Sequence, residues 1–234
     1  MINFTKTKKG FTLTELLIAL AVLAIIAAVT VPSMITITNK HNYVNGLKRS
    51  HLMLKTAISA IMADNGGTMV KVGNAADSAA LRNAFADRVC SKLNCIKICY
   101  ANSLPGVCFH NTAKTLQGTD YTFNMNWEPR AILSNGMLLI IDYGTSACNL
   151  WSATNGTSTA CGSIWLDING FKPPNQLGRD IFNFGLLQTG IIPNGTKSGA
   201  TTANWNIACN PSSASGSNGI YCAGKVLTEG AMNY

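Results

Sequence analysis

An uninterrupted apolar segment near the N-terminus constrains this chain more than any other feature. Residues 11–37 contain a single charged side chain, Glu15, in 27 positions. As a helix this segment is roughly 40 Å long at 1.5 Å per residue, which exceeds the ~30 Å hydrocarbon core of a bilayer. We therefore expect a membrane-spanning helix over residues 11–37.

The acidic side chain separates this segment from two simpler kinds of membrane segment. A cleavable secretory signal has an apolar core and a small-x-small cleavage site, and residues 27–32 offer no clean site of that kind. A plain anchor gains nothing from Glu15, because an acid without a partner costs free energy in lipid. Glu15 therefore predicts a specific partner.

The residues around Glu15 resemble a known processing motif. Residues 9–19 are Lys-Gly-Phe-Thr-Leu-Thr-Glu-Leu-Leu-Ile-Ala, at the end of a short basic leader. This is similar to the cleavage and methylation motif of type IV pilins and type II secretion pseudopilins. The resemblance implies cleavage by a prepilin peptidase between Gly10 and Phe11, methylation of Phe11, and a role in assembly for Glu15. Pro32 has the position of a helix-kinking proline in pilins; the alternative is a proline that only ends the membrane helix.

The resemblance also implies an organisation and a location for the chain. Residues 1–10 would form the leader peptide, residues 11–37 the transmembrane helix, and residues 38–234 a pilin-like globular domain that includes the second half of a long helix. The expected fold is α+β, with that helix packed on an antiparallel sheet and with disulfide-stapled loops. The chain would be a single-pass protein of the bacterial inner membrane with a periplasmic C-terminal domain, periplasmic or extracellular once assembled in a filament.

The expected function is that of a structural subunit rather than an enzyme. The implied partners are other pilin or pseudopilin subunits, the prepilin peptidase/methyltransferase and an inner-membrane assembly platform. The motif does not separate a type IV pilus from a secretion pseudopilus. A membrane-tethered ectodomain that binds a ligand and never polymerises is the alternative. A third hypothesis, an anchored hydrolase, requires a catalytic cluster around Asp167, Asp180 and His110.

Charge does not indicate a nucleic-acid partner. The formal net charge is +8, and removal of residues 1–10 leaves 15 basic and 10 acidic side chains, a net charge of +5. These charges are spread out, without a dense run of lysine and arginine among aromatic residues. We therefore expect no nucleic-acid partner.

The chain after the apolar segment predicts two stretches of helix. Residues 39–63 repeat apolar side chains at helical spacing, namely Val44, Leu47, Leu54, Ile58 and Ile61. A second helix is expected from Ser78 to about Lys92, with Asp77 or Ser78 as its N-cap.

Strands are expected after residue 120. They are Tyr121–Trp127, Ala131–Leu133, Met137–Tyr143 and Ser163–Ile168. Asn135-Gly136, between the second and third strands, predicts a two-residue hairpin turn. Segments 144–162 and 194–219 are rich in Gly, Ser, Thr and Asn and predict surface loops.

All eight cysteines follow the apolar segment: Cys90, Cys95, Cys99, Cys108, Cys148, Cys161, Cys209 and Cys222. An even number on one side of a membrane predicts an oxidising compartment and disulfides. We expect two local disulfides among the first four. Cys148 with Cys161 and Cys209 with Cys222 are the candidate pairs at the two polar loops. Zinc binding by the first four with His110 is the alternative, although their spacing is not a paired C-x2-C arrangement.

Residues 167–184 are more weakly similar to a D-x-N-G…P-N…G-x-D segment of some prepilin-type proteins. Asp167, Asn169 and Asp180 are candidate calcium ligands, because calcium prefers oxygen donors. The spacing departs from the EF-hand loop. The alternative is a turn in which Asp167 and Asp180 cap backbone amides. We expect no cofactor unless calcium binds here.

Overall fold

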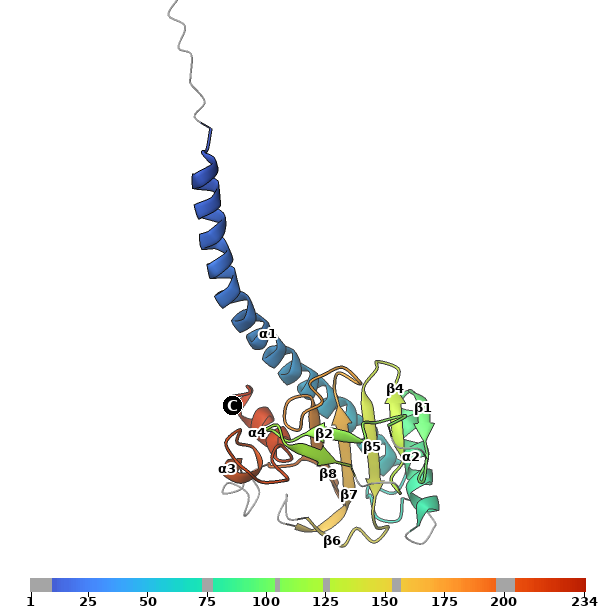
Figure 1. Cartoon of the computed structure of the whole chain (residues 1–234). Coiled ribbons are helices and arrows are strands. Elements are labelled where there is room, and N and C mark those ends of the chain that lie inside the picture. Colours follow the sequence, from blue (N-terminus) through green and yellow to red (C-terminus); the bar gives the residue numbers. More distant parts are fainter. Residues whose placement is uncertain (1–9, 73–77, 104–105, 124–126, 153–156, 197–204) are drawn as a thin grey trace, which may run out of the picture. The chain divides into compact units, whose positions relative to one another are not determined.

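The computed structural model of the chain describes six ranges, 10–72, 78–103, 106–123, 127–152, 157–196 and 205–234 (Figure 1). They fall into two compact units, Met1–Lys40 and His41–Tyr234. The long helix α1, Leu13–Ala63, supplies the described helical residues of the first unit, and its second half is the first element of the second unit. The predicted leader lies outside the described residues, except for Gly10.

The second half of α1 contributes one side of the main hydrophobic core. The predicted apolar stripe is buried, with exposed fractions of 5% or less for Val44, Leu47, Leu54, Ile58 and Ile61. His51 is half-buried and stacks on Phe184, with their ring centroids 5.9 Å apart. The helical spacing in the sequence therefore identified the packed face of α1 correctly.

Within the described residues, seven strands form one antiparallel sheet in the order β1-β4-β5-β7-β8-β9, with β6 paired to β7. The strands are β1 Cys95–Cys99, β4 Arg130–Leu133, β5 Leu138–Tyr143, β6 Leu150–Ser152, β7 Thr157–Asp167, β8 Ile181–Leu187 and β9 Gly190–Pro193. A separate hairpin joins β2 Thr112–Lys114 to β3 Asp120–Thr122. The expected α+β fold, a long helix on an antiparallel sheet, is confirmed.

Both faces of the central strands are buried. Leu139 and Ile141 of β5 belong to the core shared with α1, whereas Leu138 and Ile140 belong to a second apolar cluster. The second cluster also contains Phe109, Phe123 and Trp165. Successive side chains of a strand point to opposite faces of the sheet, so this alternation places one apolar layer on each face. Figure 1 shows the β2–β3 hairpin in front of the sheet.

Helix α2, Ala79–Leu93, matches its prediction to within one residue at each end. Ser78 caps it: its hydroxyl accepts a hydrogen bond from the Leu81 amide at 3.4 Å. Asp77, the other candidate cap, lies outside the described residues. Two shorter helices, α3 Trp205–Ala208 and α4 Cys222–Glu229, follow the sheet.

A hairpin at the predicted Asn135-Gly136 joins β4 to β5, but its turn is not the expected two-residue Asn-Gly turn, because Ser134 and Asn135 are the central residues. The Gly136 backbone has a φ of +85°, a conformation that glycine adopts without steric cost. The Gly136 amide donates to the Leu133 carbonyl at 2.9 Å, which closes the turn.

Expectations about both loops and one strand are wrong. Segment 144–162 is not entirely loop, because it contains β6 and the first residues of β7, and segment 194–219 contains helix α3. Only Asp120–Thr122 forms the strand expected at Tyr121–Trp127, and it pairs with β2 instead of joining the large sheet. Residues 124–126 lie outside the described residues.

All eight cysteines form disulfides. The pairs are Cys90–Cys95, Cys99–Cys108, Cys148–Cys161 and Cys209–Cys222. The first four cysteines therefore form two local disulfides, and each of the two polar segments is joined by one pair. With their sulfur atoms bonded to one another, these residues hold no zinc ion as thiolates.

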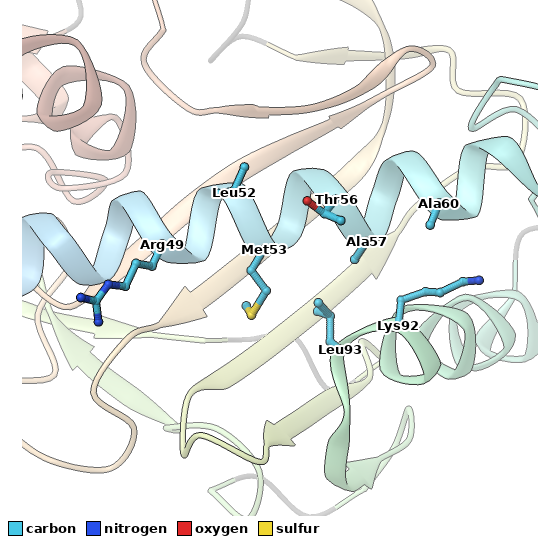
Figure 2. A pocket seen from close by; sticks show the side chains of 8 residues that line it. All are labelled: Arg49, Leu52, Met53, Thr56, Ala57, Ala60, Lys92 and Leu93. Carbon is cyan, nitrogen blue, oxygen red and sulfur yellow. The ribbon is translucent and has the colours of Figure 1, made fainter.

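A groove with a volume of about 440 Å³ lies between α1 and α2 (Figure 2). Side chains of both helices line it: Arg49, Leu52, Met53, Thr56, Ala57, Ala60, Lys92 and Leu93.

Candidate functional site

The N-terminal end of α1 is closed by a reciprocal pair of hydrogen bonds between Thr12 and Glu15. The Glu15 amide donates to the Thr12 hydroxyl oxygen at 3.2 Å, and the Thr12 amide donates to Glu15 Oε2 at 2.9 Å. The Thr12 hydroxyl also donates to Oε2 at 2.9 Å. This arrangement is a capping box, in which the first and fourth residues of a helix start satisfy each other's backbone amides.

Sequence reasoning assigned Glu15 a partner in another molecule and missed this partner within its own chain. The signal was present, because Thr12-Leu-Thr-Glu15 ahead of an apolar run is the Ser/Thr-x-x-Glu signature of a capping box. Both bonds from Thr12 end on Oε2. The Glu15 carboxylate therefore has a local role and still offers Oε1 to a second group.

The proposed cleavage bond lies just outside the helix. Gly10 and Phe11 precede the first helical residue, Leu13, and Phe11 is 90% exposed. A side chain built on Gly10 would meet no atom within 4 Å among the residues that the structure describes, its chain neighbours aside.

The first half of α1 has an apolar surface. It is long and apolar enough to cross a membrane, with a mean hydropathy of 2.6 in its most apolar window and none of that window buried. Large apolar side chains such as Leu23, Ile25 and Val29 are more than half exposed. A helix satisfies its own backbone hydrogen bonds, which a span in lipid requires. This helix and the motif together fit anchoring in the inner membrane.

Pro32 does not end α1, because the helix continues to Ala63. Proline lacks an amide hydrogen and crowds the carbonyl four residues earlier. The Thr30 hydroxyl donates to the Ile26 carbonyl at 2.9 Å, a contact that often accompanies bending. The alternative in which Pro32 only terminates the membrane helix is therefore wrong, and the kink at Pro32 stays a prediction.

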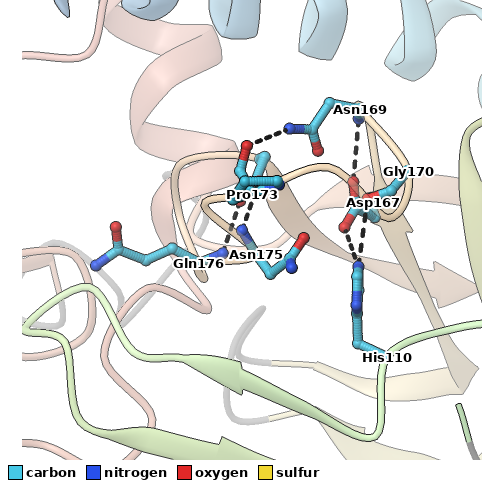
Figure 3. A network of polar contacts seen from close by, with 8 residues as sticks. His110, Asp167, Asn169, Gly170, Pro173, Asn175 and Gln176 are labelled. Carbon is cyan, nitrogen blue, oxygen red and sulfur yellow. Dashed lines mark hydrogen bonds and ion pairs between the residues drawn. The ribbon is translucent and has the colours of Figure 1, made fainter.

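A buried polar network joins the two ends of the β7–β8 connection (Figure 3). Asp167, at the end of β7, is fully buried and accepts a hydrogen bond from the Asn169 amide at 3.0 Å. Its other oxygen lies 2.9 Å from Nε2 of His110. Asp180, also fully buried, accepts from the backbone amides of Asn175 and Gln176 at 2.8 and 2.7 Å. The two carboxylates therefore organise the backbone of this connection.

These contacts bear on the calcium and hydrolase hypotheses. Burial raises the pKa of Asp180 to about 6, against the effect of its amide donors. Burial alone lowers the pKa of His110, but the hydrogen bond and the charge of Asp167 outweigh it, so the pKa rises. The structure brings His110 and Asp167 together, while Asp180 bonds to backbone amides. Calcium binding at Asp167, Asn169 and Asp180 stays a prediction, as does the hydrolase hypothesis.

A third buried carboxyl group, that of Glu128, lies just before β4 in the chain. Glu128 is 8% exposed, and burial followed by the charge of Asp142 raises its pKa to about 7. Arg82 and Arg130 oppose this shift. Arg82 Nε lies 3.6 Å from Asp142 Oδ1. The positive charge of Arg82 therefore acts on both Asp142 and Glu128.

Residues 5–31 match the family model described as the prokaryotic N-terminal methylation motif. This motif is the hallmark of the prepilin-type leader of type IV pilins and pseudopilins, so the resemblance drawn from residues 9–19 is confirmed. The matched range contains the capping box and the exposed residues Gly10 and Phe11 at the predicted cleavage bond. Neither a curated protein nor a solved structure matches the chain.

Proposed function

From the prepilin-type motif and the geometry around it, we propose that this chain is a structural subunit of a type IV pilus-like or type II secretion pseudopilus filament. The prepilin peptidase/methyltransferase cuts between Gly10 and Phe11 and methylates Phe11. The inner-membrane assembly platform then adds the subunit to others through its N-terminal helix. The C-terminal unit lies in the periplasm, an assignment supported by its four disulfides.

The observation that carries the proposal is the position of the Glu15 carboxylate at the start of an exposed apolar helix. Cleavage frees the amine of Phe11, which remains protonated after methylation. The amine of one copy can approach Glu15 Oε1 of another when the helices are offset along their axes. Opposite charges 4 Å apart attract by about 4 kcal/mol at an effective dielectric constant of 20. That attraction would offset the cost of holding the carboxylate in lipid.

The first test is chemical. Mass spectrometry of the protein co-expressed with its peptidase should show that residues 1–10 are missing and that Phe11 carries a methyl group. A mature protein that retains Met1 would contradict the proposal. Gly10→Ala, Gly10→Val and Gly10→Glu form a graded series that should reduce processing as the side chain before the bond grows.

The second test separates the charge of Glu15 from its role in the capping box. Glu15→Gln keeps an oxygen that can accept the Thr12 amide but removes the charge, so it should abolish filament assembly. Thr12→Val removes the hydroxyl contacts and keeps the carboxylate, so assembly should persist at a reduced level. Shear fractions and electron microscopy measure the outcome. Normal filaments from Glu15→Gln would contradict the assembly role of the Glu15 charge, whereas processed unaltered chain that forms no filaments would favour the membrane-tethered ligand-binding ectodomain.

A further inference from the structure

The groove between α1 and α2 has an apolar floor that one face of α1 provides. Its lining positions on α1 run from Arg49 to Ala60 at spacings of three and four, a length of about 16 Å or three helical turns. Leu52, on this face, is 66% exposed. Ala57 and Ala60 are small, so another helix can approach the backbone of α1 closely at these positions. The groove therefore has the shape and polarity that suit the apolar face of a helix.

The edges of this floor are positively charged. Arg49 and Lys92 line the groove, and Arg88 lines an adjoining hollow of about 250 Å³. The acid at this edge is Asp64, whose Oδ2 lies 2.9 Å from Lys92 Nζ. Arg49 and Arg88 form no ion pair with any other residue that the structure describes. An occupant that supplies carboxylates beside an apolar face would pair with both arginines.

The helices that the structure describes do not offer such an occupant. In α1 no acidic residue follows Glu15, and its second half carries Lys48, Arg49 and Lys55. The acid of α2 is Asp87, which accepts a hydrogen bond from the Tyr100 hydroxyl at 2.7 Å. Among the described helices, none carries two acidic residues. Within its described residues a second copy therefore has no helix with an acidic margin, and its α1 would bring further positive charge to the groove.

We propose that the α1/α2 groove docks an amphipathic helix of a different protein, with an apolar face bordered by glutamate or aspartate. The apolar face covers Leu52, Met53 and Ala60, and the acidic border pairs with Arg49 and Arg88. This inference rests on the proposed function only for the source of the helix: in a filament, the helix belongs to a subunit that is not identical to this chain. Charge complementarity discriminates between partners, so the groove would bind that subunit in preference to a second copy of this chain.

The test measures peptide binding to the full chain in a neutral detergent. The probe is a fluorescent 18-residue helical peptide with leucine and alanine on one face and four flanking glutamates. Two comparison peptides carry lysine in place of glutamate, or residues 41–63 of this chain. Fluorescence anisotropy should give an affinity for the glutamate peptide at least about tenfold higher than for either comparison peptide. Equal binding of the three peptides would overturn the proposal.

Charge-reversal variants locate the binding. The double variant Arg49→Glu with Arg88→Glu should lose at least about tenfold in affinity for the glutamate peptide. Lys97→Glu, on an exposed residue of β1, is the matched control and should bind like the unaltered chain. Thermal unfolding of each variant checks that the fold is intact, and Thr56→Trp provides an independent block of the groove. Unchanged binding by both groove variants would refute the assignment.

A lipid is the competing occupant of a basic apolar groove. Displacement of the peptide by micelles containing phosphatidylglycerol, without displacement by phosphatidylcholine, would assign the groove to an anionic lipid and overturn the proposal. The same assay with the Glu15→Gln variant should give unaltered affinity, because Glu15 lies outside the groove. Failure of the groove proposal is thus distinguishable from failure of the filament proposal, which depends on cleavage and assembly.

Discussion

Replacement of Glu128 by glutamine should stabilise the second unit above neutral pH and leave its stability in acid unchanged. Burial raises the pKa of Glu128 from 4.5 to about 7 in the folded protein. As the pH rises from 4.5 to 7, the unfolded chain therefore loses this proton while the folded chain keeps it. The linkage relation makes stability fall across that range and remain lowered above it.

The size of the effect follows from the same two values. One pKa unit corresponds to about 1.4 kcal/mol, so the difference between 4.5 and about 7 amounts to about 3 kcal/mol. Glutamine has the shape of glutamate and no charge to bury. At pH 8 the free energy of unfolding of the Glu128→Gln variant should exceed that of the unaltered chain by up to about 3 kcal/mol. At pH 4 the two free energies of unfolding should be equal.

Urea unfolding of the full chain in detergent, with its disulfides intact, measures the effect at several pH values between 4 and 8. Tryptophan fluorescence is a suitable signal, since all four tryptophans lie after residue 41. The control is Glu229→Gln, at an exposed position, which should change stability by less than about 0.5 kcal/mol at any pH. Parallel pH profiles for Glu128→Gln and the unaltered chain would refute the reasoning, as would a loss of stability at pH 8.

Two further predictions concern the core and the disulfides. Leu47→Ala should cost about 2–5 kcal/mol in denaturant unfolding because Leu47 is fully buried, while Leu52→Ala, at a 66% exposed position, should cost far less; equal costs would contradict the packing of α1. Removal of the Cys209–Cys222 disulfide by a double substitution to serine should lower the free energy of unfolding by about 3 kcal/mol, since it closes a loop of 13 residues. An unchanged unfolding midpoint under non-reducing conditions would show that this loop needs no constraint.

The sequence predicted best where a single periodicity governs a long element. The buried stripe of α1 could be identified because Val44, Leu47 and Leu54 repeat at helical spacing over two dozen residues. Local chemistry located the hairpin at Asn135-Gly136 to within one residue and narrowed the cap of α2 to Asp77 or Ser78. These features depend on neighbours within a few positions in the chain.

The missed strands lacked such a pattern. Strand β8 is buried on both faces for most of its length, so it shows no alternation of polar and apolar residues. Strand β6 and the start of β7 contain serine, threonine and glycine, a composition that resembles a loop. The contact between His110 and Asp167 joins residues 57 positions apart, and neither residue carries a local signal of its partner.

The capping box also has a consequence for maturation. The turn that begins the helix is fixed by Thr12 and Glu15, and the proposed scissile bond lies ahead of both. Under the proposed function, the peptidase can therefore cut this bond without unwinding the first helical turn. We expect the mature subunit to keep the capping box, so that removal of the leader changes the charge at the start of the helix and leaves its first turn folded.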